Sequence, residues 1–153
     1  RWPHIWDHGA WVTIDEDGYG FILGRADDVI KVGGRRIGPS EIEGALMKHG
    51  AVAEAAAIGV PHEIKGEGIM CFVVLKPGIQ PSDALKEELR DAVGKELGKV
   101  DRPEDIKFVS MLPKTRTAKI VRRVIKAKFL GKDLGDISSI ENQAAIEGIP
   151  RQD

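Results

Sequence analysis

The distribution of apolar residues predicts a β-hairpin followed by strands and helices that share one core. Two β-prone runs, Trp11–Ile14 and Tyr19–Leu23, enclose the polar turn Asp15–Gly18, an arrangement typical of a hairpin. Three later runs have the length and the small, β-branched composition of buried strands, at Ala51–Val60, Ile69–Leu75 and Ile106–Val109. We expect the first two of these three runs to be neighbours in a sheet.

Helix signals occur between the expected strands. The first helix begins at Pro39, has Ser40–Glu43 as a capping box, and ends at Gly50. Ser82 caps a second helix, which ends at Gly98. The inward stripe of the second helix consists of Leu85, Leu89, Ala92, Val93 and Leu97. Both helices are therefore expected to cover the sheet.

The last helix is expected from Lys119 to Leu130, with Gly131 after it, and a second capping box at Ser138–Glu141 predicts a further helical turn or two in the tail. The order helix, strand, strand, helix, strand, helix predicts an α+β fold. We expect a small mixed three-stranded sheet covered by helices in two layers and preceded by a β-hairpin lobe. The chain then divides into an N-terminal segment with the hairpin (1–24), an α+β domain (25–131) and a tail (132–153).

Composition narrows the classes of protein to be considered. The 153 residues suit one domain, and 42% apolar with 31% charged residues is typical of a soluble globular protein. The net charge of −1 argues against a nucleic-acid binder, and the single cysteine, Cys71, excludes a disulfide framework. No apolar run has the length of a membrane span and no signal peptide is apparent, so we expect a cytoplasmic protein that does not bind membranes. Because the chain opens at Arg1 without methionine, we expect a fragment of a larger protein.

The first eleven residues hold all three tryptophans, at Trp2, Trp6 and Trp11. Exposed tryptophan is costly, so these rings are expected to lie against a part of the protein outside this chain. His4 and His8 have the i, i+4 spacing of a metal pair. Pro3 and the aromatic surroundings disfavour a helix there, and no third ligand is apparent. We therefore predict no metal site.

Residues 24–43 combine turn glycines with fixed charges. Gly33 and Gly34 follow a short apolar strand and allow the backbone a positive φ or a close approach to another molecule. Asp27 and Asp28 form an acidic pair of the kind that stabilises a bend. The positive charges around them are those of Arg25, Lys31, Arg35 and Arg36. Two interpretations remain open from spacing alone, a tight hairpin with solvated charges or a loop that contacts a ligand.

A second charged segment lies between Met111 and Gly131 and has no acidic residue. Its basic residues are Lys114, Arg116, Lys119, Arg122, Arg123, Lys126 and Lys128. Such a run is either a solvated helix face or an anion site for phosphates, since a lysine at the mouth of a loop is a mobile point charge with three donors. We expect a strong local positive potential in either case.

The two segments together resemble a known enzyme family. GRADDVIKVGGRRIGPSEIE, at 24–43, resembles the hinge-and-loop motif of the AMP-forming acyl-CoA synthetases, and PKTRTAKIVRR, at 113–123, is similar to their lysine-bearing motif. The similarity extends from the turn at 15–19 to the tail at 133–142. It implies the mobile C-terminal domain of a larger ATP-dependent enzyme, closest to acetyl-CoA or short-chain synthetases. The implied reaction joins a carboxylate to CoA through an acyl-adenylate, releasing AMP and pyrophosphate.

The resemblance implies roles for particular residues. Lys119 would be the catalytic lysine that enters the active site during adenylation, and Asp27 would be the hinge. Arg36 would contact the adenylate phosphate, with Arg25 as a polar neighbour of the same site. The glycine pair, Gly33 and Gly34, would form the loop that approaches the pantetheine arm of CoA, where a side chain would obstruct the tunnel.

Two positions depart from the family pattern. Gly9-Ala10 stands where the family has a Gly-Asp pair whose carboxylate binds the ribose hydroxyls, so no ribose role is assigned here. Thr117-Ala118 stands where Ser-Gly usually precedes the lysine, and alanine narrows the conformational range of that loop.

The resemblance also implies ligands and partners. ATP and CoA would be substrates beside a small carboxylate, with Mg²⁺ in the full-length enzyme and none of these bound by this fragment alone. The N-terminal domain of the same polypeptide would be the main partner, and a lysine acetyltransferase with its deacetylase would act on Lys119. The fragment alone is expected to be inactive. The rival interpretation is a freestanding α+β regulatory module that uses its basic face to bind nucleotides or a partner protein.

Overall fold

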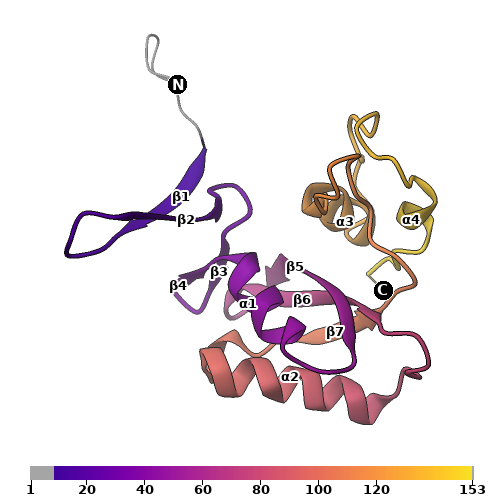
Figure 1. Cartoon of the computed structure of the whole chain (residues 1–153), viewed down its shortest axis with the longest axis horizontal. Helices are drawn as coiled ribbons and strands as arrows, with labels where there is room; N and C mark the ends of the chain where they lie inside the picture. The colour runs from indigo at the N-terminus through magenta and orange to yellow at the C-terminus, as the bar shows by residue number, and fades with distance from the viewer. Residues whose placement is uncertain (1–8, 153) are drawn as a thin grey trace.

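The computed structural model describes residues 9–152 and contains two sheets with helices around the larger one (Figure 1). The strands are β1 (Ala10–Ile14), β2 (Gly20–Arg25), β3 (Ile30–Val32), β4 (Arg35–Ile37), β5 (Val52–His62), β6 (Gly66–Leu75) and β7 (Asp105–Phe108). The helices are α1 (Pro39–Met47), α2 (Asp83–Leu97), α3 (Arg122–Phe129) and α4 (Ala144–Glu147), with a 3₁₀ turn at Lys99–Asp101. No helix in this part of the chain is long and apolar enough to cross a membrane.

The expected hairpin is confirmed and forms a two-stranded sheet of its own, β1 and β2, which projects away from the larger sheet in Figure 1. The Asp15 carboxylate closes its turn by accepting hydrogen bonds from the amides of Asp17 (3.1 Å) and Tyr19 (2.8 Å). Several of its apolar side chains are exposed, namely Val12, Ile14, Tyr19, Phe21 and Ile22. The predictions for Trp2, Trp6, His4 and His8 lie outside the described residues.

The α+β class is confirmed, but the larger sheet has five strands instead of three. Its order is β4-β3-β6-β5, and β7 pairs in parallel with β6. The three expected strands are β5, β6 and β7. The two additional strands arise because Gly33 and Gly34 both adopt positive φ, which lets residues 35–37 fold back antiparallel on residues 30–32. β5 stands at one edge of the sheet.

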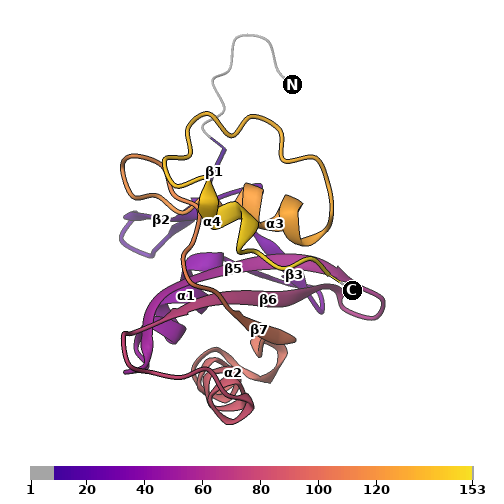
Figure 2. The same ribbon diagram turned by 90° about the vertical axis from the view of Figure 1, so that its right-hand side faces the viewer.

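Helices cover both faces of the larger sheet, so the domain has three layers instead of the expected two (Figure 2). Alternate residues of β6 explain why: Ile69, Cys71 and Val73 face α1 and α2, whereas Met70 and Phe72 face α3. A strand buried on both sides reads as a continuous apolar run, so β6 lacks the apolar–polar alternation that marks a strand with one covered face. Cys71 is fully buried, and burial raises the pKa of its thiol.

The ends of α2 and the start of α1 at Pro39 agree with the sequence, whereas the capping residue of α1 does not. The Ser82 hydroxyl accepts a hydrogen bond from the Leu85 amide (3.1 Å), and Gly98 ends the helix. α1 is capped by Gly38 instead of Ser40, and the Glu41 carboxylate accepts from the Gly38 amide (3.1 Å). Pro39 explains the shift, because its fixed φ suits the first helical position.

The C-terminal third also differs from expectation. α3 begins at Arg122, so Lys119 lies in the loop before it. Ser138–Glu141 is not helical, because the Ser138 amide donates to the Asp136 carboxylate (2.9 Å) and Ile140 pairs as a strand with Thr115. The tail at 132–153 packs on the domain, since Ile149 belongs to the core between β6 and α3. These contacts place the tail against the loop that carries Lys119.

Candidate functional site

Lys119 lies at the end of a tight turn between two short extended limbs. The limbs are joined by a bridge between Lys114 and Ile120, and the Thr115 amide donates to the Lys119 carbonyl (3.0 Å). The Thr115 hydroxyl accepts a hydrogen bond from the Lys119 amide (3.3 Å). Lys119 itself is exposed. We call residues 113–121 the lysine hairpin.

Ala118 has a φ of 61°, and no other non-glycine residue in the described chain has a positive φ. This left-handed conformation is favourable for glycine and unfavourable for residues with a Cβ atom. The Ala118 amide donates to the Thr115 carbonyl (2.9 Å), so the strained residue closes the turn directly before Lys119. The alanine therefore adopts a backbone conformation that glycine would adopt at a lower energetic cost.

A hollow of about 630 Å³ lies between the lysine hairpin and the β1–β2 hairpin. It brings together residues far apart in sequence: Gly9, Ala10, Ile22, Gly24, Arg25, Asp28, Ala118, Lys119, Ile120 and Arg122. Of the predicted site residues, Lys119 and Arg25 share this hollow. Gly9 and Ala10, where the family's carboxylate is missing, line it as well. Its mixture of apolar and cationic groups suits an anionic ligand with an apolar part.

Asp27 lies in the turn that follows β2, at residues 26–28. Its carboxylate accepts two hydrogen bonds from the Arg25 guanidinium, each of 2.8 Å, and this bonding raises the pKa of Arg25. Both side chains are largely exposed, so the pair contributes little to stability. The Ala26 amide donates to the Gly9 carbonyl (2.7 Å), which ties the turn to the start of β1.

A network of half-buried charges lies behind the turn. The Arg122 guanidinium donates to both carboxylate oxygens of Glu43, at 2.6 and 2.5 Å, and lies 3.6 Å from the Asp28 carboxylate. The bonds to Glu43 raise the pKa of Arg122, while burial raises the pKa of Asp28 more than Arg122 lowers it. Glu43 also accepts a hydrogen bond from the Ala57 amide (3.0 Å). One cation thus joins α1, the edge of β5 and the turn at 26–28.

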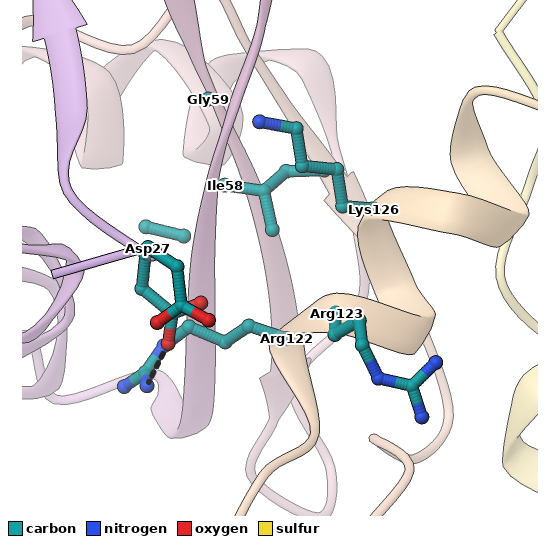
Figure 3. Close-up of a pocket in the computed structure, with 8 residues that line it drawn as sticks. Asp27, Ile58, Gly59, Arg122, Arg123 and Lys126 are labelled. Carbon is teal, nitrogen blue, oxygen red and sulfur yellow. Dashed lines mark ion pairs between the residues drawn. The ribbon is translucent and has the colours of Figure 1, made fainter. Parts of the chain in front are cut away.

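Figure 3 shows a small cavity beside this network, with room for about one water molecule (about 30 Å³). Arg122 reaches toward the carboxylates of the turn, and the dashed line marks its ion pair with Asp28, whereas Arg123 points away. Lys126 extends toward Gly59. The remaining lining residues are Asp27, Ala57 and Ile58.

Most of the basic run between 111 and 131 is paired, which corrects the expected strong positive potential. Its ion pairs are Lys114 with Glu54, Arg122 with Glu43, Lys126 with Glu67 and Lys128 with Glu147. Arg123 instead donates to the carbonyl of Asp136 (2.6 Å). Within residues 9–152, Lys119, Arg116 and Arg123 are the members of the run that form no ion pair, and Arg123 is held by backbone carbonyls. The acidic partners come from β5, α1, β6 and α4. They lie outside the run in the sequence, so the amino-acid composition of the run could not reveal them.

Gly33 and Gly34 form the turn between β3 and β4, with φ of 55° and 83°. The Gly33 amide donates to the Lys65 carbonyl (3.0 Å), and a Cβ on Gly33 would lie 3.4 Å from Val100. A Cβ on Gly34 would meet no atom within 4 Å. The second glycine is therefore needed for its backbone conformation and not for space inside this chain.

Arg36 and the glycine turn lie outside the hollow that contains Lys119. The guanidinium carbon of Arg36 lies 5.3 Å from the centroid of a Trp11 ring, a cation–π contact between β4 and β1. The structure therefore separates the predicted residues into two groups. Lys119 and Arg25 share one site, while Arg36, Gly33 and Gly34 lie outside it, on β4 and in the turn between β3 and β4. No three potential metal ligands cluster among residues 9–152.

The glycine turn is anchored by an ion pair that the sequence did not indicate. The Arg35 guanidinium lies 2.9 Å from the Asp101 carboxylate, which has no exposed surface and accepts no hydrogen bond. Burial raises the pKa of Asp101, and the charge of Arg35 only partly opposes this shift. The ionised carboxylate therefore carries a desolvation cost at neutral pH.

Replacing Asp101 with asparagine should therefore make stability less dependent on pH. The folded pKa of Asp101 lies above the unfolded value, so its contribution to stability is largest below the unfolded pKa and is lost as pH rises through the folded pKa. The stability of Asp101→Asn relative to wild type should thus improve between about pH 4 and about pH 7. Urea unfolding at several pH values tests this. A relative loss for the variant over that range would mean that the Arg35 pair dominates.

Comparisons with known proteins identify the family of the chain. The family described as AMP-binding enzyme C-terminal domain matches residues 41–119. The chain is 48% identical to an acetyl-coenzyme A synthetase of Pyrobaculum aerophilum and 47% identical to a 3-hydroxypropionyl-coenzyme A synthetase of Sulfurisphaera tokodaii. Each alignment covers 99% of this chain, but 22% and 23% of the respective relative.

Among solved structures, the ATP-bound RpMatB-BxBclM chimera B1 matches with a TM-score of 0.73 and 39% identity. The match covers 80% of this chain and 24% of the chimera. The chain thus spans less than a quarter of the length of the relatives it matches. The family match covers more than half of the chain and includes the segment that ends at Lys119. The chain belongs to the family of AMP-binding enzyme C-terminal domains.

Proposed function

We propose that the chain is the mobile C-terminal domain of an ATP-dependent, AMP-forming acyl-CoA synthetase. The observation that carries the proposal is the position of Lys119, exposed on a tight hairpin, without an ion pair, beside a hollow shared with Arg25. The remaining basic residues of the segment are mostly bound by internal partners. A lysine kept apart from such a network is available to an incoming anion.

In the first half-reaction a carboxylate oxygen attacks the α-phosphorus of ATP, forming an acyl-adenylate and releasing pyrophosphate. Negative charge develops around phosphorus, and a preorganised cation stabilises it. Lys119 supplies that cation in our proposal. Arg25 adds charge at the rim of the same hollow, and Arg36 contacts the adenylate phosphate when the domain has turned.

In the second half-reaction the CoA thiol attacks the acyl carbonyl, and AMP leaves. We assign the Gly33–Gly34 turn to this step, as the surface over which the pantetheine arm passes. Asp27 is the hinge between the steps. The described contacts support a hinge here, since the Arg25–Asp27 pair is exposed and few of these contacts join the β1–β2 hairpin to the α+β domain, among them the Arg36–Trp11 contact and the contact of β2 with α1.

ATP, CoA and a small carboxylate are the substrates in this proposal. The names of the two relatives favour a short acyl group such as acetyl or 3-hydroxypropionyl. Mg²⁺ would be held mainly by the ATP phosphates and by the N-terminal domain of the same polypeptide, because the described residues offer no cluster of ligands. Lys119 is also exposed enough to be the target of a lysine acetyltransferase and deacetylase.

The test compares the longer polypeptide with the 153-residue chain alone. Incubated with ATP, Mg²⁺, acetate and labelled pyrophosphate, the longer protein should exchange label into ATP, and the chain alone should give no exchange above a buffer control. Exchange by the chain alone would contradict the proposal, because it would place the whole ATP site here. Nucleotide binding by the chain alone, without activity in the longer protein, would favour a regulatory module.

A further inference from the structure

The tail forms a third strand beside the lysine hairpin. Ile140 pairs with Thr115, and the Glu141 amide donates to the Lys114 carbonyl (2.9 Å). Lys114 pairs on its other side with Ile120. The limb before the turn is therefore held between the returning limb of the hairpin and the tail.

The side chain of Asn142 completes this arrangement. Its Oδ1 accepts a hydrogen bond from the Lys114 amide (2.8 Å), and its Nδ2 donates to the Leu112 carbonyl (2.8 Å). A carboxamide is the side-chain group that offers a donor and an acceptor in this geometry. Asn142 thus satisfies two backbone groups of a limb that is too short to form a regular ladder.

The tail can act as a support because it is itself fixed to α3. Ile140 is 4% exposed and packs in a cluster with Val124 of α3 and Ile146 of α4. The Arg123 guanidinium donates to the Asp136 carbonyl (2.6 Å) at the beginning of the same segment. The tail therefore transmits the position of α3 to the hairpin.

The hairpin needs such a support. Apart from the tail, its limbs are held by the Lys114–Ile120 bridge, by a few hydrogen bonds between the limbs and by the Lys114–Glu54 ion pair, and Ala118 adopts an unfavourable φ of 61°. A strained turn persists only where its surroundings determine it. We propose that Asn142 is a positioning residue for Lys119, and that it sets the direction in which the lysine hairpin projects into the hollow. The proposal rests on the proposed function only for the role of Lys119 in adenylation, and the positioning of the lysine hairpin by Asn142 does not depend on it.

The test uses Asn142→Leu, which has a similar volume and loses both hydrogen bonds, in the longer protein. Hydrogen exchange at the amides of Lys119 and Val121 should be about tenfold faster than in wild type. The rate of acyl-adenylate formation should fall about tenfold, while thioester formation from preformed acyl-adenylate should be unchanged. Asn142→Asp keeps the acceptor for Lys114 and should give intermediate effects, which covers the case in which the leucine variant does not fold.

Lys128→Ala is the matched control, because it removes another contact between α3 and the tail, the Lys128–Glu147 ion pair (3.2 Å), away from the hairpin. It should change none of these rates. Unchanged amide exchange in Asn142→Leu would overturn the proposal, as would an equal decrease in both half-reactions, which would indicate a purely structural role. If Lys119→Ala leaves adenylation intact, the proposed function fails. Faster amide exchange in Asn142→Leu would still show that the tail holds the lysine hairpin in place.

Discussion

Lys119→Ala should slow acyl-adenylate formation by about 10²- to 10³-fold in the full-length enzyme, since this is the typical cost of removing one preorganised group that stabilises developing charge. Thioester formation from preformed acyl-adenylate should continue, because the glycine turn that we assign to this step lies outside the hollow beside Lys119. The measurement is each half-reaction assayed separately. Acetylation of Lys119 removes the same charge. It should therefore reproduce the alanine phenotype.

Gly34→Leu should have the opposite effect in the same assays. A Cβ at Gly34 would meet no atom within 4 Å, so we expect the leucine side chain to project outward into the path that we assign to the pantetheine arm. Gly78→Leu is the matched control, because Gly78 has a similar φ (85°) and equally open surroundings in another turn. It reports the cost of backbone strain alone. If Lys119→Ala and Gly34→Leu slow both steps in equal proportion, the assignment of the two steps to two sites is wrong.

Arg122→Ala should lower the free energy of unfolding by about 3 kcal/mol. This value is near the lower limit for breaking a buried ion pair, because the Arg122 side chain is partly exposed. The substitution removes both hydrogen bonds to Glu43 and the ion pair with Asp28. Two half-buried carboxylates then lack a counter-charge. Arg102→Ala is the control, since its ion pairs with Glu87 and Asp91 are at the surface and should contribute less than about 1 kcal/mol.

The deficit of Arg122→Ala should also depend on pH. Burial already raises the pKa of Asp28, and Arg122 is the largest influence that lowers it, so its loss raises that pKa further. Because the folded pKa then lies further above the unfolded one, the cost is present at neutral pH and is relieved as pH falls toward the unfolded value. Chemical denaturation across this range measures the effect. A deficit that is constant with pH would contradict a role for the Asp28 charge.

Local signals in the sequence predicted the elements whose causes are local. Ser82 and Gly98 delimit α2 as expected, since a cap depends on neighbours within four residues. β5 and β6 were identifiable because both are long apolar runs. The motif at 113–123 placed Lys119 in a loop, and in the structure Lys119 is exposed in a loop. The helix that follows begins at Arg122, three residues later than the expected start at Lys119.

Features with distant causes were not predictable in the same way. Arg122 binds Glu43 across 79 positions, and Lys114 is held by Asn142 across 28. Neither pairing leaves a periodic signal in the sequence. Glu43 even suggested a wrong role, as part of a capping box, because the same residue type serves both purposes. The second covered face of the sheet was hidden for the related reason that small residues such as Ala56 and Ala57 suit both faces equally.

The position of β5 at the edge of the sheet affects more than the local geometry of the turn at 26–28. An eleven-residue, mostly apolar strand with a free edge is a template on which a second copy of the chain can add a strand, the first step of aggregation. Here the Glu43 carboxylate accepts the hydrogen bond of the Ala57 amide, and Pro61 near the end of β5 has no amide hydrogen to offer. The carboxylate that binds Arg122 behind this turn thus also protects the edge of β5 from pairing with other chains.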